Sequence, residues 1–147
     1  MTVVRTVLGD IAPDALGVTA AHEHLWCDQT MAKAADFPRT GEPMYLQDLA
    51  MVVDEASRFH AAGGRAIVEV TVHGWGRDLA TLAEISRRTG LHVIATAGFY
   101  VESCHPDFVP ASTIEQLTDF LVGEVLDGAD GGPARCGLLK AAVGQAL

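Results

Sequence analysis

Two histidines separated by one residue are the first side chains in the sequence that could do chemistry. His22 and His24 lie in the stretch GVTAAHEHLW, directly after a run of small apolar residues. If this run is a β-strand, residues two apart project from the same face, so both imidazoles would point the same way. Neutral imidazole binds zinc, iron, manganese and cobalt well. The pair also fits two partly exposed histidines at a strand end, so a metal site requires further ligands.

A lysine inside an apolar segment is the second unusual residue. Lys140 interrupts the stretch CGLLKAAVG, which has the composition of a short buried strand. Lysine is rarely buried without a purpose, because its charge is expensive to remove from water. Its amine could form a Schiff base with a carbonyl substrate, or react with carbon dioxide to give a carbamate that bridges two cations. Alternatively, the side chain extends to the strand end and keeps its charge in water.

Other polar residues near expected strand ends are weaker candidates. His73 follows a β-branched run and is expected at the same end of the sheet as the histidine pair, whereas His92 begins a strand and is expected at the opposite end. Cys104, His105 and Asp107 form a cluster in the stretch YVESCHPDF, which is typical either of a metal-binding loop or of ordinary loop polarity.

Short apolar segments alternate with helical patterns along the chain, and these elements must position the candidate residues. We expect a hairpin over 5–19, strands over 18–25, 66–72, 92–99 and 136–144, and helices over 45–64, 78–90 and 112–128. Such alternation predicts βαβ units and a parallel α/β sheet, either open and doubly wound or part of a (β/α)₈ barrel. The stretch GWGRD lacks the third glycine of a dinucleotide-binding fingerprint, so nucleotide binding is disfavoured.

Residues that favour helix ends support two of these helices. Asp78 is expected to cap the start of the second helix, and Gly90 follows its end. Ser112 and Glu115 have the spacing of a capping box at the start of the third helix.

Composition excludes several classes of partner. The chain has 147 residues and a formal net charge of −9, which argues against nucleic acid or an anionic membrane as a partner. No apolar run approaches the length of about 18 residues that a membrane span needs, and the N-terminus has no signal-peptide pattern. Cys27, Cys104 and Cys136 are few and widely spaced, so we expect reduced thiols in a cytoplasmic protein.

Three segments together resemble the phosphotriesterase family of the amidohydrolase superfamily. The stretch RTVLGDIAPDALGVTAAHEHL is similar to the opening signature of the family. The stretch GGRAIVEVTVHGWGRDLATLAEISRRTGLHVIATAGFY is similar to its second and third βα units. The stretch ARCGLLKAAVG is similar to its fourth strand, around a metal-bridging lysine.

The resemblance implies a (β/α)₈ barrel with a small N-terminal hairpin and two divalent ions, usually zinc. His22 and His24 match the pair that binds the more buried ion, Lys140 matches the bridging lysine carbamate, and Tyr100 matches an aromatic residue that lines the substrate pocket. Family members hydrolyse phosphotriesters, lactones or related esters. The two cations lower the pKa of a bridging water and polarise the substrate oxygen.

The resemblance also implies that residues 1–147 form a single partial domain, the N-terminal half of such a barrel. A full barrel takes about 250 residues, and the remaining metal ligands of the family, two histidines and an aspartate, lie on later strands. No spacing supports His73, His105 or Glu69 as their replacement. We therefore expect the isolated chain to self-associate, to pair with a C-terminal half-barrel, or to fold poorly. The alternatives are a non-catalytic truncated remnant or subunit, and a Schiff-base lyase that uses Lys140.

Overall fold

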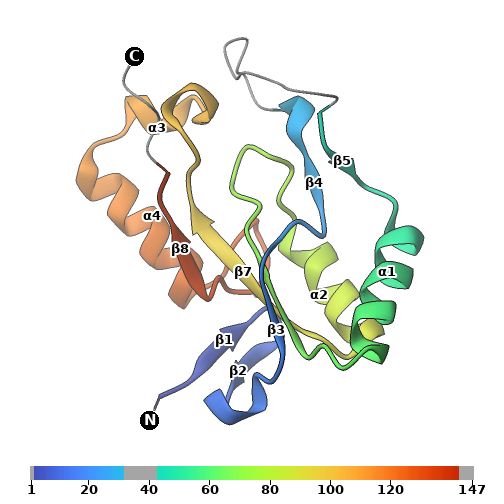
Figure 1. Ribbon diagram of the computed structural model, residues 1–147. Helices are drawn as coiled ribbons and strands as arrows, with labels where there is room; N and C mark the ends of the chain where they lie inside the picture. Colours follow the sequence, from blue (N-terminus) through green and yellow to red (C-terminus); the bar gives the residue numbers. More distant parts are fainter. Residues whose placement is uncertain (1, 32–42, 143–147) are drawn as a thin grey trace.

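A four-stranded parallel sheet forms the centre of the fold (Figure 1). The computed structural model describes residues 2–31 and 43–142. In order across the sheet, the strands are β3 (Thr19–Glu23), β6 (Ala66–Glu69), β7 (His92–Gly98) and β8 (Leu138–Lys140). Neighbouring strands are parallel throughout, which confirms the expected α/β arrangement.

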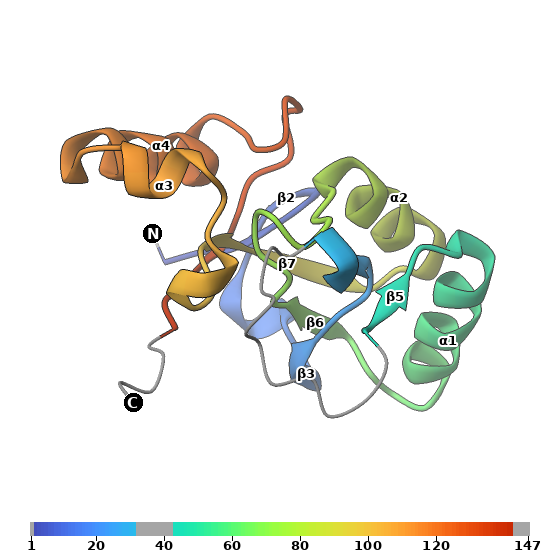
Figure 2. The same ribbon diagram turned by 90° about the horizontal axis from the view of Figure 1, so that it is seen from above.

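Three helices lie outside the strands. They are α1 (Leu49–Ala61), α2 (Leu79–Thr89) and α4 (Ile114–Leu126). Seen from above, they follow one another in an arc, and among the described residues the opposite side of the strands has no such helical layer (Figure 2). A (β/α)₈ barrel has its strands inside and its helices outside. This chain has the same arrangement over half of the circumference of such a barrel.

The predicted ends of α2 are confirmed. The Asp78 carboxylate accepts hydrogen bonds from the backbone N–H of Ala80 and of Thr81, at 2.9 and 3.1 Å. Gly90 ends the helix in the left-handed conformation, with φ at 74°, which a glycine adopts without steric strain.

The capping box of α4 lies one residue later than predicted. Thr113 and Gln116 form it, with the Thr113 Oγ1 accepting from Gln116 N at 3.2 Å and the Gln116 Oε1 accepting from Thr113 N at 2.8 Å. The Ser112 hydroxyl instead donates to the Phe108 carbonyl at 2.7 Å. Ser112 therefore ends the short helix α3 (Phe108–Ala111), so that Ser112 and Glu115 do not form the predicted box.

The remaining elements are short. They are β1 (Val4–Thr6), β2 (Gly9–Ile11), η1 (Pro13–Ala15), β4 (Cys27–Asp28), η2 (Gln29–Met31), β5 (Tyr45–Leu46) and η3 (Glu102–Cys104). The expected N-terminal hairpin is the antiparallel pair β1–β2. In its turn, the backbone N–H of Val7 donates a hydrogen bond to the Val93 carbonyl at 2.9 Å, which attaches the hairpin to β7. The antiparallel pair β4–β5 was not predicted, and it explains why α1 begins at Leu49 and not at Tyr45.

Burial differs sharply between the middle and the edges of the sheet. Every residue of β7 after His92 is buried, whereas β3 and β8 are largely exposed. Leu138 and Leu139 are 42% and 62% exposed. The last strand is also shorter than the predicted 136–144, and residues 143–147 lie outside the described part. The apolar composition of β8 thus does not mean that it is covered on both faces.

Candidate metal centre

The histidine pair lies at the C-terminal end of β3. This strand ends at Glu23, and its pairing with β6 shifts between Ala20 and Glu23, where three residue steps on β3 match two on β6. The simple alternation that predicted a shared face is therefore interrupted. The two imidazoles are nevertheless neighbours, with ring centroids 6.1 Å apart.

His24 is held more firmly than His22, which is exposed. The His24 Nδ1 lies 2.8 Å from the Thr71 hydroxyl, and its ring lies 6.1 Å from that of Trp75. Burial lowers the pKa of His24 to about 4, and the positive charges of Lys140 and His22 act in the same direction. His24 is thus a neutral imidazole near pH 7, which is the form that binds a metal.

Lys140 extends from β8 across the C-terminal end of β7 towards β6. Its Nζ donates to the Val70 carbonyl at 3.0 Å and lies 5.3 Å from the centre of the Tyr100 ring. Burial lowers the pKa of Lys140, while the negative charge of Glu69 opposes this shift. The side chain is half-buried. The amine thus lies over the same strand ends as His24, and its charge acts on that imidazole.

Aromatic rings connect the two sides of the candidate centre. The Trp75 ring lies 4.7 Å from the Tyr100 ring, and Trp75 is only 5% exposed. Trp75 therefore neighbours both His24 and Tyr100, and Tyr100 in turn lies against Lys140. Trp75 was not among the site residues predicted from the sequence. Its position just beyond a predicted strand, at the same end as the histidines, was an available signal.

Glu69 lies beneath the centre and does not present a free carboxylate to it. Its oxygens accept hydrogen bonds from Leu25 N at 3.2 Å, Thr71 N at 3.1 Å and the Thr71 hydroxyl at 2.5 Å. The residue is fully buried. Glu69 therefore supports the residues around His24 and does not replace a missing ligand.

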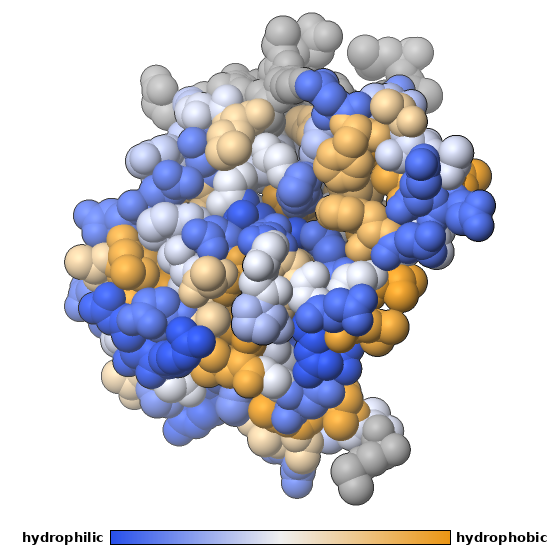
Figure 3. All heavy atoms as spheres, turned by 180° about the vertical axis from the view of Figure 1, so that it is seen from behind, coloured by the Kyte–Doolittle hydropathy of each residue, from blue (hydrophilic) through white to orange (hydrophobic). Residues whose placement is uncertain are grey.

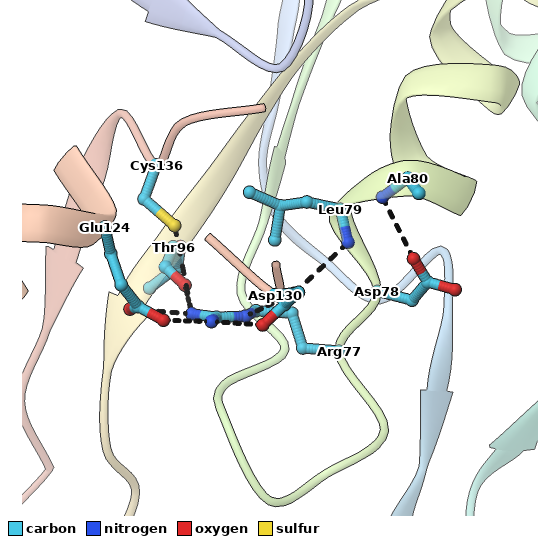
Figure 4. A network of polar contacts seen from close by, with 8 residues as sticks. All are labelled: Arg77, Asp78, Leu79, Ala80, Thr96, Glu124, Asp130 and Cys136. Carbon is cyan, nitrogen blue, oxygen red and sulfur yellow. Dashed lines mark hydrogen bonds and ion pairs between the residues drawn. The ribbon is translucent and has the colours of Figure 1, made fainter. Parts of the chain in front are cut away.

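A second group of metal-ligand types does not fit a cation. Within the described part of the chain, His73, Glu124 and Asp130 are the one set of three such side chains whose ligand atoms lie within 4.8 Å of one another. The Arg77 guanidinium already pairs with both carboxylates, contacting Asp130 at 2.7 Å and Glu124 even more closely (Figure 4). A cation would have to displace this buried arginine. We interpret the group as an ion-pair network that joins the segment before α2, the helix α4 and the segment before β8.

Two of the loop candidates contact aromatic residues of the candidate centre. Cys104 is buried against Val72 and Trp75. His105 uses its Nε2 to contact the Tyr100 carbonyl at 2.9 Å, so this nitrogen holds the loop in place. His92 begins β7, which places it at the opposite end of the strands as expected.

Comparisons with known proteins agree with this arrangement. Residues 2–146 match the profile of the phosphotriesterase family. The chain is 36% identical over 160 residues to the N-acetyltaurine hydrolase of Salmo salar, with 92% of this chain and 46% of that protein covered.

Two solved structures share the fold. A lactonase from Listeria monocytogenes matches with a TM-score of 0.80 and 31% identity, over 94% of this chain and 46% of that protein. A resiniferatoxin-binding protein from Rhodobacter sphaeroides matches with a TM-score of 0.81 and 34% identity, over 93% of this chain and 45% of that protein. The chain thus spans about half the length of these relatives and corresponds to the N-terminal half of their barrel. It belongs to the phosphotriesterase family.

Proposed function

We propose that this chain supplies one corner of the binuclear metal centre of a hydrolase. The observation that carries the proposal is the convergence of His22, His24 and Lys140 over the C-terminal ends of the parallel strands. Two imidazoles and a lysine whose pKa is lowered by burial form a donor set that suits zinc, provided that the lysine becomes a carbamate.

Each residue then has a distinct role. His22 and His24 would hold one cation at the end of β3. Lys140 would act as a further ligand once its neutral amine had added to carbon dioxide and lost a proton to give a carbamate. Tyr100 and Trp75 form an aromatic wall beside the substrate. The bound ions, when present, supply a water of lowered pKa as nucleophile and polarise the bond that is hydrolysed.

The relatives also support a proposal for the substrate class. Their names include a lactonase and an N-acetyltaurine hydrolase, so carbonyl hydrolysis is common to both. We propose a small-molecule lactone, ester or phosphotriester as substrate, with the N-acyl amide as a further candidate. Neither nucleic acid nor membrane is proposed as a partner, and none of the described helices is long and apolar enough to cross a membrane.

A complementary half-barrel is the partner that the surface favours. Among the described residues, β3 and β8 each pair on one side only. A cavity of about 420 Å³ opens between β3 and α1, and another of about 340 Å³ opens between α4 and β8. Seen from behind, apolar side chains also interrupt the polar surface in several places (Figure 3). Unpaired strand edges flanked by apolar hollows invite association.

Size-exclusion chromatography with light scattering tests this association. We expect the isolated chain to self-associate, or to form a one-to-one complex with a co-expressed C-terminal half-barrel from the family. A well-folded monomer that does not bind the added C-terminal half-barrel would contradict the proposal.

Activity is tested on the same complex with a lactone, a phosphotriester and N-acetyltaurine. The metal-hydrolase proposal expects hydrolysis that a chelator abolishes and added zinc restores. Chelator-resistant activity, with borohydride trapping of substrate on Lys140, would favour the Schiff-base lyase instead. A folded complex without bound metal would favour the non-catalytic subunit.

We also propose a cytoplasmic location. The three cysteines are all free and buried, which suits a reducing compartment.

A further inference from the structure

The Thr71 hydroxyl lies between two groups that compete for its hydrogen. Its Oγ1 is 2.5 Å from the Glu69 Oε1 and 2.8 Å from the His24 Nδ1. All three residues are sheltered from solvent, because Glu69 and Thr71 are fully buried and His24 is partly buried. Bulk water is thus a poor substitute for these two contacts.

The surroundings of Glu69 determine the direction of both hydrogen bonds. Leu25 N–H and Thr71 N–H both point to its carboxylate, and two donors of this kind suit an ionised carboxylate. Burial raises the pKa of Glu69 to about 7, whereas the two backbone N–H donors favour the ionised carboxylate, and we take this form at pH 8. An ionised carboxylate can only accept, so the Thr71 hydroxyl must donate its single hydrogen to Glu69.

The His24 tautomer then follows. Since the Thr71 hydrogen is already donated to Glu69, the short contact to His24 requires that Nδ1 carries the hydrogen and donates it to the Thr71 oxygen. A neutral imidazole with hydrogen on Nδ1 has its free electron pair on Nε2. This is the nitrogen left available to a metal.

We infer that Glu69 and Thr71 are positioning residues that fix His24 in the Nδ1–H tautomer and so present Nε2 to the metal. The inference rests on the proposed metal centre for its purpose, but the tautomer itself is a property of the metal-free chain. Residues behind the ligands of a metal centre commonly fix ligand orientation in this way, and their loss lowers metal affinity about 10–100-fold.

The tautomer is measured directly by long-range ¹H–¹⁵N correlation spectra of the full chain, labelled with ¹⁵N-histidine and free of metal at pH 8. His24 is assigned by its absence in His24→Gln. We expect the wild-type His24 to show a protonated Nδ1 and an unprotonated Nε2. A protonated Nε2 in the wild type would overturn the inference without any appeal to a variant.

Variants of Thr71 supply the causal test. Thr71→Val removes the hydroxyl at nearly constant volume and should shift His24 towards the Nε2–H tautomer, whereas Thr71→Ser should preserve the wild-type pattern. Thr96→Val is the matched control, because Thr96 is a buried threonine that hydrogen-bonds to the Glu69 backbone carbonyl at 2.8 Å. An unchanged tautomer in folded Thr71→Val, or an equal shift in Thr96→Val, would refute the role of Thr71.

Cobalt titration of the same proteins, followed by visible absorption, links the tautomer to metal binding. We expect Thr71→Val to weaken binding about 10–100-fold, with Thr71→Ser and Thr96→Val close to wild type. If wild type binds no cobalt although His24 has the expected tautomer, the proposed metal centre fails and the hydrogen-bond assignment stands. If cobalt binds equally to wild type and Thr71→Val, the positioning role fails and the metal centre stands.

Discussion

Removing the buried Arg77 guanidinium should destabilise the fold far more than removing an exposed arginine with similar partners. The Arg77 side chain is 0% exposed and pairs with Glu124 and Asp130, whose side chains are 5% and 16% exposed. The same guanidinium donates to the Thr96 carbonyl at 3.0 Å. Arg77→Met would therefore leave two carboxylates in a poorly solvated site without their cation.

The size of the effect follows from this burial. Removing one partner of a buried ion pair costs about 3–5 kcal/mol, because the other charge remains uncompensated. Arg58 is the matched control: it also pairs with two carboxylates, Asp54 at 2.8 Å and Glu55 at 2.7 Å, but all three side chains are at least 67% exposed. Arg58→Met should therefore cost less than about 1 kcal/mol.

Urea unfolding, followed by far-ultraviolet circular dichroism and tryptophan fluorescence at two protein concentrations, measures both variants. Arg77→Met/Glu124→Leu should recover part of the lost free energy of unfolding, because one of the two stranded carboxylates is gone. Similar losses for Arg77→Met and Arg58→Met would show that burial of the ion pair does not determine its contribution, as would a double variant less stable than Arg77→Met.

Three further predictions concern other parts of the described chain. Gly98→Ala should lower the free energy of unfolding, measured by urea denaturation, by about 1–3 kcal/mol or more, and it should loosen β8. The φ of Gly98 is +111°, and the added Cβ would lie 2.1 Å from the Lys140 carbonyl oxygen. Burial raises the pKa of Cys27 to about 11 and of Cys136 to about 12, so both thiols should react slowly with Ellman's reagent at pH 8 in the native chain and quickly in urea; rapid native reaction would contradict this. Burial also raises the pKa of Glu69 from 4.5 to about 7, so the native state retains a proton that the unfolded state releases. The contribution of this proton to the free energy of unfolding is complete below pH 4.5 and is lost as the pH rises through 7. The free energy of unfolding of wild type, relative to that of Glu69→Gln, should therefore fall between pH 4.5 and 7. A rise over this range would contradict the raised pKa.

Features encoded in neighbouring residues could be predicted from the sequence. The alternating apolar strands and amphipathic helices gave the parallel sheet, and Asp78 and Gly90 marked the ends of α2 because capping depends on residues close in the chain. The capping box of α4 was misplaced by one residue because Ser112 and Thr113 both have a suitable acidic or amide residue three positions later. Only the contact of Ser112 with α3 decides between them.

Features built from distant residues could not be predicted. Arg77 contacts Glu124 and Asp130 across 47 and 53 residues of chain, and no local pattern encodes such a pair. The contact between His24 and Thr71 spans 47 residues. The resemblance to a family could indicate which residues form the candidate centre, but their burial and hydrogen bonds required the fold.

Zinc binding by the chain itself is the decisive test of the proposed metal centre. Equilibrium dialysis against zinc in bicarbonate buffer, with metal measured by mass spectrometry, is compared for wild type and for His22→Ala/His24→Ala. The control is His92→Ala, which removes a histidine from the opposite end of the strands. We expect zinc to bind to wild type and to the control but not to the double variant. Equal zinc binding by all three proteins would contradict it.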